Sequence, residues 1–279
     1  MPTLSAPDGT ALYYEVFEPA RPTCAVFFLP GWSDHAGRWT HVGERLRDAG
    51  MAAYMLDARG QGRAAGRRGH LSRFSQLLGD LQAFRRLARL KAALPHVVFG
   101  HSFGGLVVLR YLETQPSDPI AAAIVASPWL GLAFQPPAWK LTVARALADL
   151  WPTLALPAGI DCDHLSRDPA VGPAYTADPL VHQVMTAGAW REIQWAQRVL
   201  PADAHRVEAP VLFLLAGEDR IVDSQLARAF ADSLKTDVQV RWYAEMYHEV
   251  LLDPQRDQVW TDTVAFLIDR GLARQRLPT

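Results

Sequence analysis

The stretch at residues 97–109, VVFGHSFGGLVVL, constrains the fold more than any other part of the chain. An apolar run leads into Gly100, Gly104 and Gly105, and a second apolar run follows them. Glycines this dense weaken a regular helix or strand, so the backbone must require them. We interpret the pattern as a strand that turns sharply into a helix, with Ser102 at the tip of the turn.

Short apolar runs recur along the chain and end in Gly, Pro, Asp or Ser. They read CAVFFLPG, MAAYMLDARG, HVVFGHS, AAAIVASP and PVLFLLAGED. Such runs are typical of strands buried on both faces of a parallel sheet. Helical patterns alternate with them at about residues 38–49, 75–93, 103–115, 223–234 and 257–270. The alternation predicts an α/β fold with a mostly parallel, doubly wound sheet, and ALYYEVF predicts an antiparallel edge strand.

The alternation is interrupted once, after Pro128. From there to about Ala209 the chain is rich in proline and has helical patterns but no clear strand, and PVLFLLAGED then resumes the sheet. We therefore predict a core made of residues 1–128 and 209–279, with residues 129–208 inserted as a helical cap. The alternative is that this stretch forms ordinary surface helices.

The predicted cap is rich in aromatic side chains. It carries five of the nine tryptophans, which are Trp129, Trp139, Trp151, Trp190 and Trp195. The helical spacing of Trp139, Val143 and Leu147 predicts one apolar helix face. Large aromatic residues suit pocket walls and lipid interfaces, although they also fill a small core. We assign substrate contacts to these three residues and to Trp129.

Composition and charge exclude several classes of protein. The net charge of -1 gives no general attraction to nucleic acid, so no nucleic-acid partner is expected. Cys24 and Cys162 are the two cysteines and offer neither a disulfide framework nor a zinc spacing. The first residues lack a signal-peptide pattern, and the run IAAAIVASPWLGLAF is too short to span a bilayer. We expect a cytoplasmic protein, peripheral to the membrane at most.

The motif Gly100-His101-Ser102-Phe103-Gly104 fits a nucleophile on a strained strand-to-helix turn. The turn would present the Ser102 hydroxyl at the carboxyl end of the sheet, where open α/β sheets bind ligands. The start of the following helix supplies N–H groups and a positive dipole that stabilise a developing oxyanion. The alternative is a glycine-rich turn that only packs the helix closely against the strand.

A serine nucleophile needs a histidine base. Among the nine histidines, His248 follows the strand-like run VQVRWYA and precedes the last helix. In hydrolases with this turn the order along the chain is serine, acid, histidine, and His248 fits the last place. His101 adjoins the serine and is expected to point away from it.

The acid that orients the histidine should follow the preceding strand, where the sequence reads GEDRIVD. We choose Asp219, because it lies just past the strand end after a glycine. Glu218 and Asp223 are the alternatives, although Asp223 has the position of a helix N-cap. For the oxyanion we assign two backbone donors, the N–H of Phe103 and the N–H of Trp32 in the loop after CAVFFLPG.

With these residues in place, the sequence resembles the α/β-hydrolases, and within them the monoacylglycerol lipase and lysophospholipase group (serine aminopeptidase S33-type hydrolases). The shared segments are GWSDHAGRW, DARGQGRAAGRRGHLSRF, GHSFGG, LSRDPAVGPAYTADPLVH, GEDRIVD and YHEVLLD, which together cover nearly the whole chain. The resemblance implies a triad of Ser102, Asp219 and His248, oxyanion donors on Trp32 and Phe103, and a helical cap. The chain departs from the family at Pro30, where His is usual, and in the bulk of Trp32.

The resemblance implies a serine hydrolase that cleaves carboxylic esters of monoacyl lipids through an acyl-enzyme, with no metal or organic cofactor. A short-chain carboxylesterase or thioesterase is one alternative, and a ligand-binding protein without catalysis is another. Only Glu192 and Glu208 are glutamates of the cap, which disfavours a pocket for a substrate amine.

The cap is also expected to contact a membrane surface transiently. Four arginines form a basic cluster, which consists of Arg63, Arg67, Arg68 and Arg73. They could bind a phosphate head group or an anionic membrane surface, but such a run is more often a solvated loop.

Overall fold

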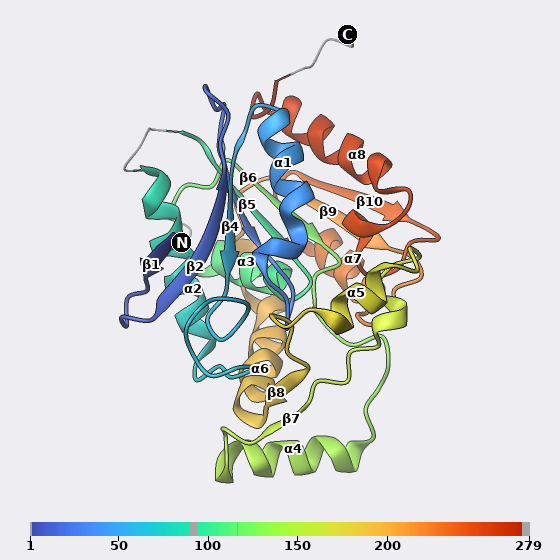
Figure 1. Ribbon diagram of the computed structural model, residues 1–279. Helices are drawn as coiled ribbons and strands as arrows, with labels where there is room; N and C mark the ends of the chain where they lie inside the picture. Colours follow the sequence, from blue (N-terminus) through green and yellow to red (C-terminus); the bar gives the residue numbers. More distant parts are fainter. Residues whose placement is uncertain (1, 90–93, 116, 275–279) are drawn as a thin grey trace.

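An eight-stranded sheet forms the centre of the computed structural model, which describes residues 2–89, 94–115 and 117–274 (Figure 1). The strand order is β1-β2-β4-β3-β5-β6-β9-β10. The strands are β1 (Thr3–Ser5), β2 (Ala11–Phe17), β3 (Ala25–Leu29), β4 (Ala52–Asp57), β5 (His96–His101), β6 (Ala122–Ala126), β9 (Val211–Ala216) and β10 (Val238–Tyr243). β2 is antiparallel to β1 and β4, and all other neighbours in this sheet are parallel. The predicted fold class is confirmed.

Helices cover both faces of the sheet, because its central strands are apolar on both sides. Phe27 of β3 packs into a core shared with α2, α3 and α7, whereas Phe28 packs into a second core shared with α1 and α8. Adjacent side chains of a strand point to opposite faces, so one strand contributes to both cores. The helices are α1 (Thr40–Asp48), α2 (Phe74–Arg89), α3 (Phe103–Thr114), α7 (Ser224–Ser233) and α8 (Arg256–Ile268).

Two predicted elements differ from the structure: one strand has another place in the sheet, and one helix was predicted to run beyond the described residues. ALYYEVF forms β2, which is not the edge of the sheet, because β1 pairs with its outer side. The three residues of β1 are too few to show an alternating pattern. The helix predicted over residues 75–93 corresponds to α2, which is described over Phe74–Arg89, and residues 90–93 lie outside the described part of the chain.

The segment between β6 and β9 adds no strand to the eight-stranded sheet, because Val125 of β6 pairs directly with Phe213 of β9. It forms the lower part of the molecule in Figure 1. Its helices and strands are α4 (Ala138–Leu150), β7 (Ala155–Pro157), α5 (Val171–Ala177), β8 (Val184–Thr186) and α6 (Ala187–Asp203). The short 3₁₀ helices of the chain are η1 (Ala36–Trp39), η2 (Cys162–His164), η3 (Ala204–Arg206) and η4 (Val250–Leu252). The expectation that this segment lacks strands was wrong, since β7 and β8 pair as a small antiparallel sheet whose strands are too short to show a sequence pattern.

Polar contacts hold the end of this segment against the loops at the carboxyl ends of the strands. The Thr186 N–H donates to the Gly69 carbonyl at 2.8 Å, and the Trp32 indole N–H donates to the Val184 carbonyl at 3.1 Å. α6 also contributes Ile193 to the core on the α2 and α3 side. The segment therefore covers the edge of the sheet at which the predicted catalytic residues lie.

No helix among the described residues is long and apolar enough to cross a membrane.

Candidate active site

Ser102 lies between β5 and α3 in a strained backbone conformation, with φ of 51° and ψ of -114°. A non-glycine residue rarely adopts a positive φ, and such strain occurs where the surrounding structure enforces it. The Ser102 N–H donates to the Ala126 carbonyl at 2.9 Å, and the Ser102 carbonyl accepts from the Trp129 N–H at 3.0 Å. These contacts fix the turn from both sides.

Close backbone approach explains the glycines of the turn. A Cβ at Gly100 would lie 2.3 Å from the Gly104 carbonyl oxygen, and a Cβ at Gly104 would lie 2.1 Å from the Leu29 carbonyl oxygen. Both distances are far shorter than a van der Waals contact. The glycines therefore let α3 begin directly against the end of β3.

This close approach places the two residues that carry the predicted oxyanion donors next to each other. Trp32 follows β3, and Phe103 is the first residue of α3. Their rings pack edge to face with centroids 5.0 Å apart. The Trp32 side chain lines the cavity at Ser102, and its indole N–H is held by the Val184 carbonyl.

Asp219 and His248 meet at the ends of the neighbouring strands β9 and β10. The His248 Nδ1 lies 2.8 Å from Asp219 Oδ2, and both side chains are buried. The other Asp219 oxygen accepts the N–H groups of Ile221 and Val222, each at 2.9 Å. The carboxylate is therefore fixed in orientation before it meets the histidine.

The alternative acids do not reach His248. The Asp223 carboxylate accepts the N–H groups of Gln225 and Leu226, and so caps the start of α7. Glu218 is exposed.

The surroundings of His248 favour its charged form. Burial alone would lower the pKa of His248, but the carboxylates of Asp219, Glu249 and Asp34 raise it above the usual value of 6.5. His101 behaves in the opposite way, because burial and the nearby His248 hold its pKa well below 6.5. The two rings are 5.0 Å apart, so His101 packs against the candidate base.

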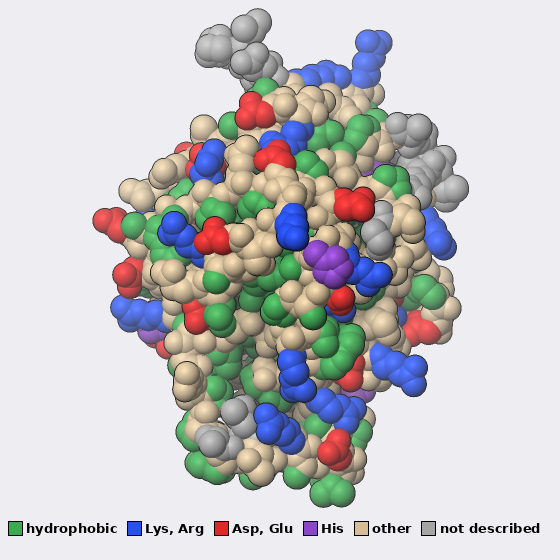
Figure 2. Space-filling model, turned by 180° about the vertical axis from the view of Figure 1, so that it is seen from behind, with side chains coloured by type: hydrophobic (Ala, Val, Ile, Leu, Met, Phe, Trp, Pro, Cys, Tyr) green, Lys and Arg blue, Asp and Glu red, His purple; other side chains and the backbone are tan. Residues whose placement is uncertain are grey.

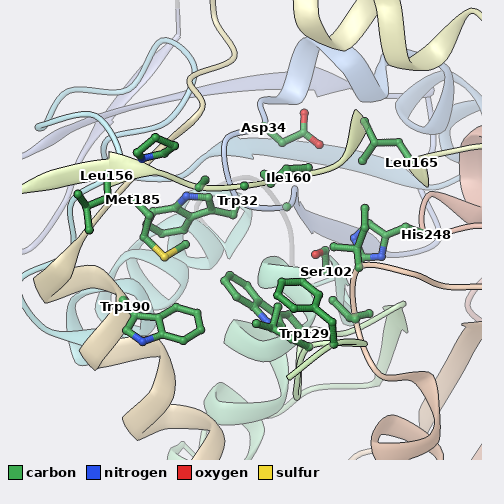
Figure 3. A pocket seen from close by; sticks show the side chains of 18 of the residues that line it. Trp32, Asp34, Ser102, Trp129, Leu156, Ile160, Leu165, Met185, Trp190 and His248 are labelled. Carbon is green, nitrogen blue, oxygen red and sulfur yellow. The ribbon is translucent and has the colours of Figure 1, made fainter. Parts of the chain in front are cut away.

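A cavity of about 320 Å³ opens at Ser102 and His248. Figure 3 shows its two sides. Leu156, Met185 and Trp190 lie on one side of Ser102, beyond Trp32, whereas His248 lies on the other side. We call the side with Leu156, Met185 and Trp190 the apolar arm, and the part near His248, where the carboxylates of Asp34 and Glu249 raise its pKa, the polar arm. Glu249 and Tyr175 also line the cavity.

The four residues predicted to contact the substrate lie in different places. Trp129 is buried and lines the cavity, but Trp139, Val143 and Leu147 are not among the described residues that line it. Trp139 and Val143 are 66% and 47% exposed, and among the described side chains of α4 it is Ala144 that lines the cavity. The helical spacing marks one apolar face of α4 correctly, but it does not say whether that face points inward or outward.

The basic cluster also lies outside the described cavity lining. Its four arginines are all exposed, and Arg63 is paired with Glu15. No described group of His, Cys, Asp and Glu is arranged to hold a metal ion.

Several cavity residues escaped the sequence reasoning. Glu249 follows the candidate base directly in YHEVLLD, which is a usable signal. Met185 carries no local signal, and Trp190 stands out only as one of five tryptophans of the segment, because the positions of both depend on how β8 and α6 pack over the core.

The sheet, the strained serine and the buried Asp–His pair define the class of this protein: it is an α/β-hydrolase of the lipase and esterase type. The family model described as "Serine aminopeptidase, S33" matches residues 20–255. The chain belongs to this family.

Known proteins resemble the chain over nearly its whole length. A monoacylglycerol lipase of Mycolicibacterium smegmatis is 33% identical, with 93% of this chain and 94% of that protein covered. A phospholipase of Bacillus subtilis is 27% identical over 88% of this chain and 95% of its own length. Among solved structures, the monoacylglycerol lipase of Paleococcus ferrophilus has a TM-score of 0.85 and 30% identity, covering 93% of this chain and 99% of that one.

Proposed function

We propose that this protein hydrolyses the carboxylic ester of monoacyl lipids and releases a small neutral alcohol such as glycerol. The observation that carries the proposal is the lining of the cavity, which is apolar on one side of Ser102 and includes carboxylates near His248. A monoacyl ester has the same division, with an apolar chain on one side of the carbonyl and a polar alcohol on the other. The name of one relative, a monoacylglycerol lipase, supports this substrate class, and the name of another, a phospholipase, supports an ester of a lipid.

In the proposed mechanism, Ser102 attacks the ester carbonyl and His248 accepts its proton. Asp219 holds the Nδ1 side of His248, so that Nε2 faces the serine, and stabilises the charged ring. The N–H groups of Trp32 and Phe103 bind the oxyanion. His248 then protonates the leaving alcohol, and water cleaves the acyl-enzyme by the same route.

The charges of the polar arm favour a neutral alcohol over a phosphate head group. Asp34 and Glu249 line this arm, and both carboxylates bind the same guanidinium, that of Arg38. Two negative charges against one positive charge leave the arm with a net negative charge. A phosphate would be repelled there, because like charges are costly at a buried site.

We further propose that residues 129–208 act as a cap over a core of residues 1–128 and 209–279, and that the cap contacts a membrane surface transiently. Large apolar side chains of α4 are exposed, with Trp139 at 66% and Leu150 at 84%. Figure 2 shows hydrophobic side chains at the lower end of the molecule, where α4 lies. The protein would then be cytoplasmic and peripheral. Vesicle sedimentation tests this: Leu150→Ser should weaken binding, and unchanged binding would contradict it.

Hydrolysis rates across esters of varied chain and head group test the proposed substrate. We expect medium-chain and long-chain monoacylglycerols to have a higher kcat/KM than the matching lysophospholipids and than acetate or butyrate esters. A short-chain carboxylesterase would show an optimum at two to four carbons, by rough analogy with a shallow pocket. Such an optimum, or a clear preference for lysophospholipids, would overturn the assignment.

A further inference from the structure

A buried ion pair lies directly beside the candidate base. The Glu249 carboxylate accepts two hydrogen bonds from Arg38, from Nη1 to Oε1 and from Nη2 to Oε2, each at 2.9 Å. Glu249 is 2% exposed, and the Arg38 side chain is 10% exposed. Two parallel hydrogen bonds fix both the distance and the relative orientation of the groups. Since Glu249 is the residue after His248, the pair fixes the loop that carries the base.

The same guanidinium reaches the loop that carries Trp32. Arg38 Nη1 lies 3.1 Å from Asp34 Oδ2, which also accepts the Trp39 indole N–H at 2.7 Å. The other Asp34 oxygen accepts the His35 N–H at 2.7 Å. Arg38 therefore connects the segment after β3, which holds a proposed oxyanion donor, to the segment after β10, which holds the proposed base.

We propose that Arg38 and Glu249 are positioning residues, which hold the histidine loop and the oxyanion loop in register across the cavity. The proposal rests on the roles proposed for His248 and Trp32. Neither residue is assigned a contact with the reacting atoms. Tyr175 of α5 completes the arrangement from the cap side, because its ring covers the Arg38 guanidinium at 4.6 Å.

Stability alone explains this arrangement poorly. A buried ion pair gains little over well-packed apolar side chains, because the desolvation of both charges offsets their attraction. What a bidentate pair supplies is a defined geometry. Small displacements of catalytic groups have large effects on rate, so a defined geometry matters most beside the reacting atoms.

The charged and titratable groups that face His248 come from four parts of the chain. Asp219 follows β9, Glu249 belongs to the histidine loop itself, Asp34 and Arg38 belong to the segment after β3, and the neutral His101 ends β5. Loss of the Glu249 charge removes an anion and leaves Arg38 less compensated. Both changes disfavour the imidazolium and lower the pKa of His248.

Three variants separate geometry from charge. Arg38→Lys keeps the charge but loses the bidentate bond. Glu249→Gln loses the charge but nearly keeps the shape. The double variant Arg38→Met with Glu249→Met removes both charges and keeps the cavity filled. Each is assayed with a short p-nitrophenyl ester over pH, and its rate of labelling at Ser102 by a fluorophosphonate is measured.

We expect Arg38→Lys to reduce kcat by about tenfold with little change in KM and no shift of the acid limb of kcat/KM. Glu249→Gln should lower kcat and also move the acid limb to lower pH. The double variant should have a lower kcat but no clear shift of the acid limb, because the two charges that are removed have opposite signs. Labelling at Ser102 should slow in parallel with kcat.

A matched control lies further along the same loop. Asp253 is buried and forms a bidentate pair with Arg167 at 2.8 and 2.7 Å, and neither residue is among the described residues that line the cavity. Asp253→Asn should reduce thermal stability and leave kcat and the acid limb unchanged. The proposal is overturned if Arg38→Lys and Glu249→Gln retain the unmodified kcat and pH profile, or if Asp253→Asn lowers kcat as much as they do. Failure of the unmodified protein to be labelled at Ser102 would instead overturn the proposed function.

Discussion

His248 Nδ1 lies 2.8 Å from Asp219 Oδ2, at the ends of two adjacent parallel strands. The two residues are far apart in sequence, and the pairing of β9 with β10 brings them together. Because two backbone N–H groups hold the other Asp219 oxygen, the carboxylate has one orientation. The histidine is thereby restricted to the tautomer with its proton on Nδ1.

Replacing this carboxylate should remove most of the activity. Asp219→Asn is expected to lower kcat by about 10⁴-fold, because an amide favours the wrong tautomer of His248 while the fold is kept. Asp223→Asn is the matched control in the same loop. It should cost at most about 1 kcal/mol of stability as a weakened helix cap and leave kcat nearly unchanged. Steady-state kinetics of the two variants decide the matter, and the reverse ranking would move the acid to Asp223.

The pH profile of kcat/KM should report the raised pKa of His248. The base must be neutral to accept the serine proton, so activity is lost as pH falls through this pKa. We expect the midpoint of the acid limb above 6.5, because three carboxylates raise the pKa of His248. His182 is no competing source of this limb, since burial lowers its pKa to about 4. An acid limb centred well below 6.5 would contradict the charge arrangement described here.

The close packing at the serine turn can be tested through its glycines. Gly104→Ala should destabilise the fold by at least about 2 kcal/mol, because the new Cβ would meet backbone atoms that cannot move aside. Gly79 lies inside α2, where the nearest atom to a new Cβ is 3.5 Å away. Gly79→Ala should therefore stabilise by up to about 1 kcal/mol. Urea unfolding measures both changes, and equal effects would refute the packing argument.

The apolar arm should set the preference for chain length. Each methylene buried there contributes about 0.8 kcal/mol, so two methylenes should raise kcat/KM by about tenfold until the arm is filled. Trp190→Ala should flatten this dependence, because Trp190 lines the arm. Trp195→Ala on the same helix is the control, since Trp195 is 44% exposed and outside the described cavity lining. Identical slopes for both variants would exclude Trp190 as a determinant of chain length.

The sequence was most informative where local chemistry decides the structure. Apolar runs ending in Gly, Pro or Asp predicted the parallel strands, and the close contact at Gly104 explains why GHSFGG is a usable signal. Asp219 and His248 could be chosen because each follows a strand of the same sheet. These inferences needed only the order of the elements.

Features that depend on packing between distant segments were not predictable. Arg38 and Glu249 are 211 residues apart, and no local pattern pairs them. The spacing of Trp139, Val143 and Leu147 gave an apolar face of α4 but not the direction in which it points. Three-residue strands such as β7 are too short for any periodicity to appear.

The identity of the nucleophile is the central claim, and labelling of Ser102 with a fluorophosphonate tests it most directly. Mass spectrometry of the labelled protein should place the adduct on Ser102, with hydrolysis of a monoacylglycerol lost in proportion to labelling. Ser102→Ala should neither be labelled nor hydrolyse the ester, while its thermal unfolding stays cooperative. An adduct on another residue, or hydrolysis by Ser102→Ala near the unmodified rate, would contradict the mechanism.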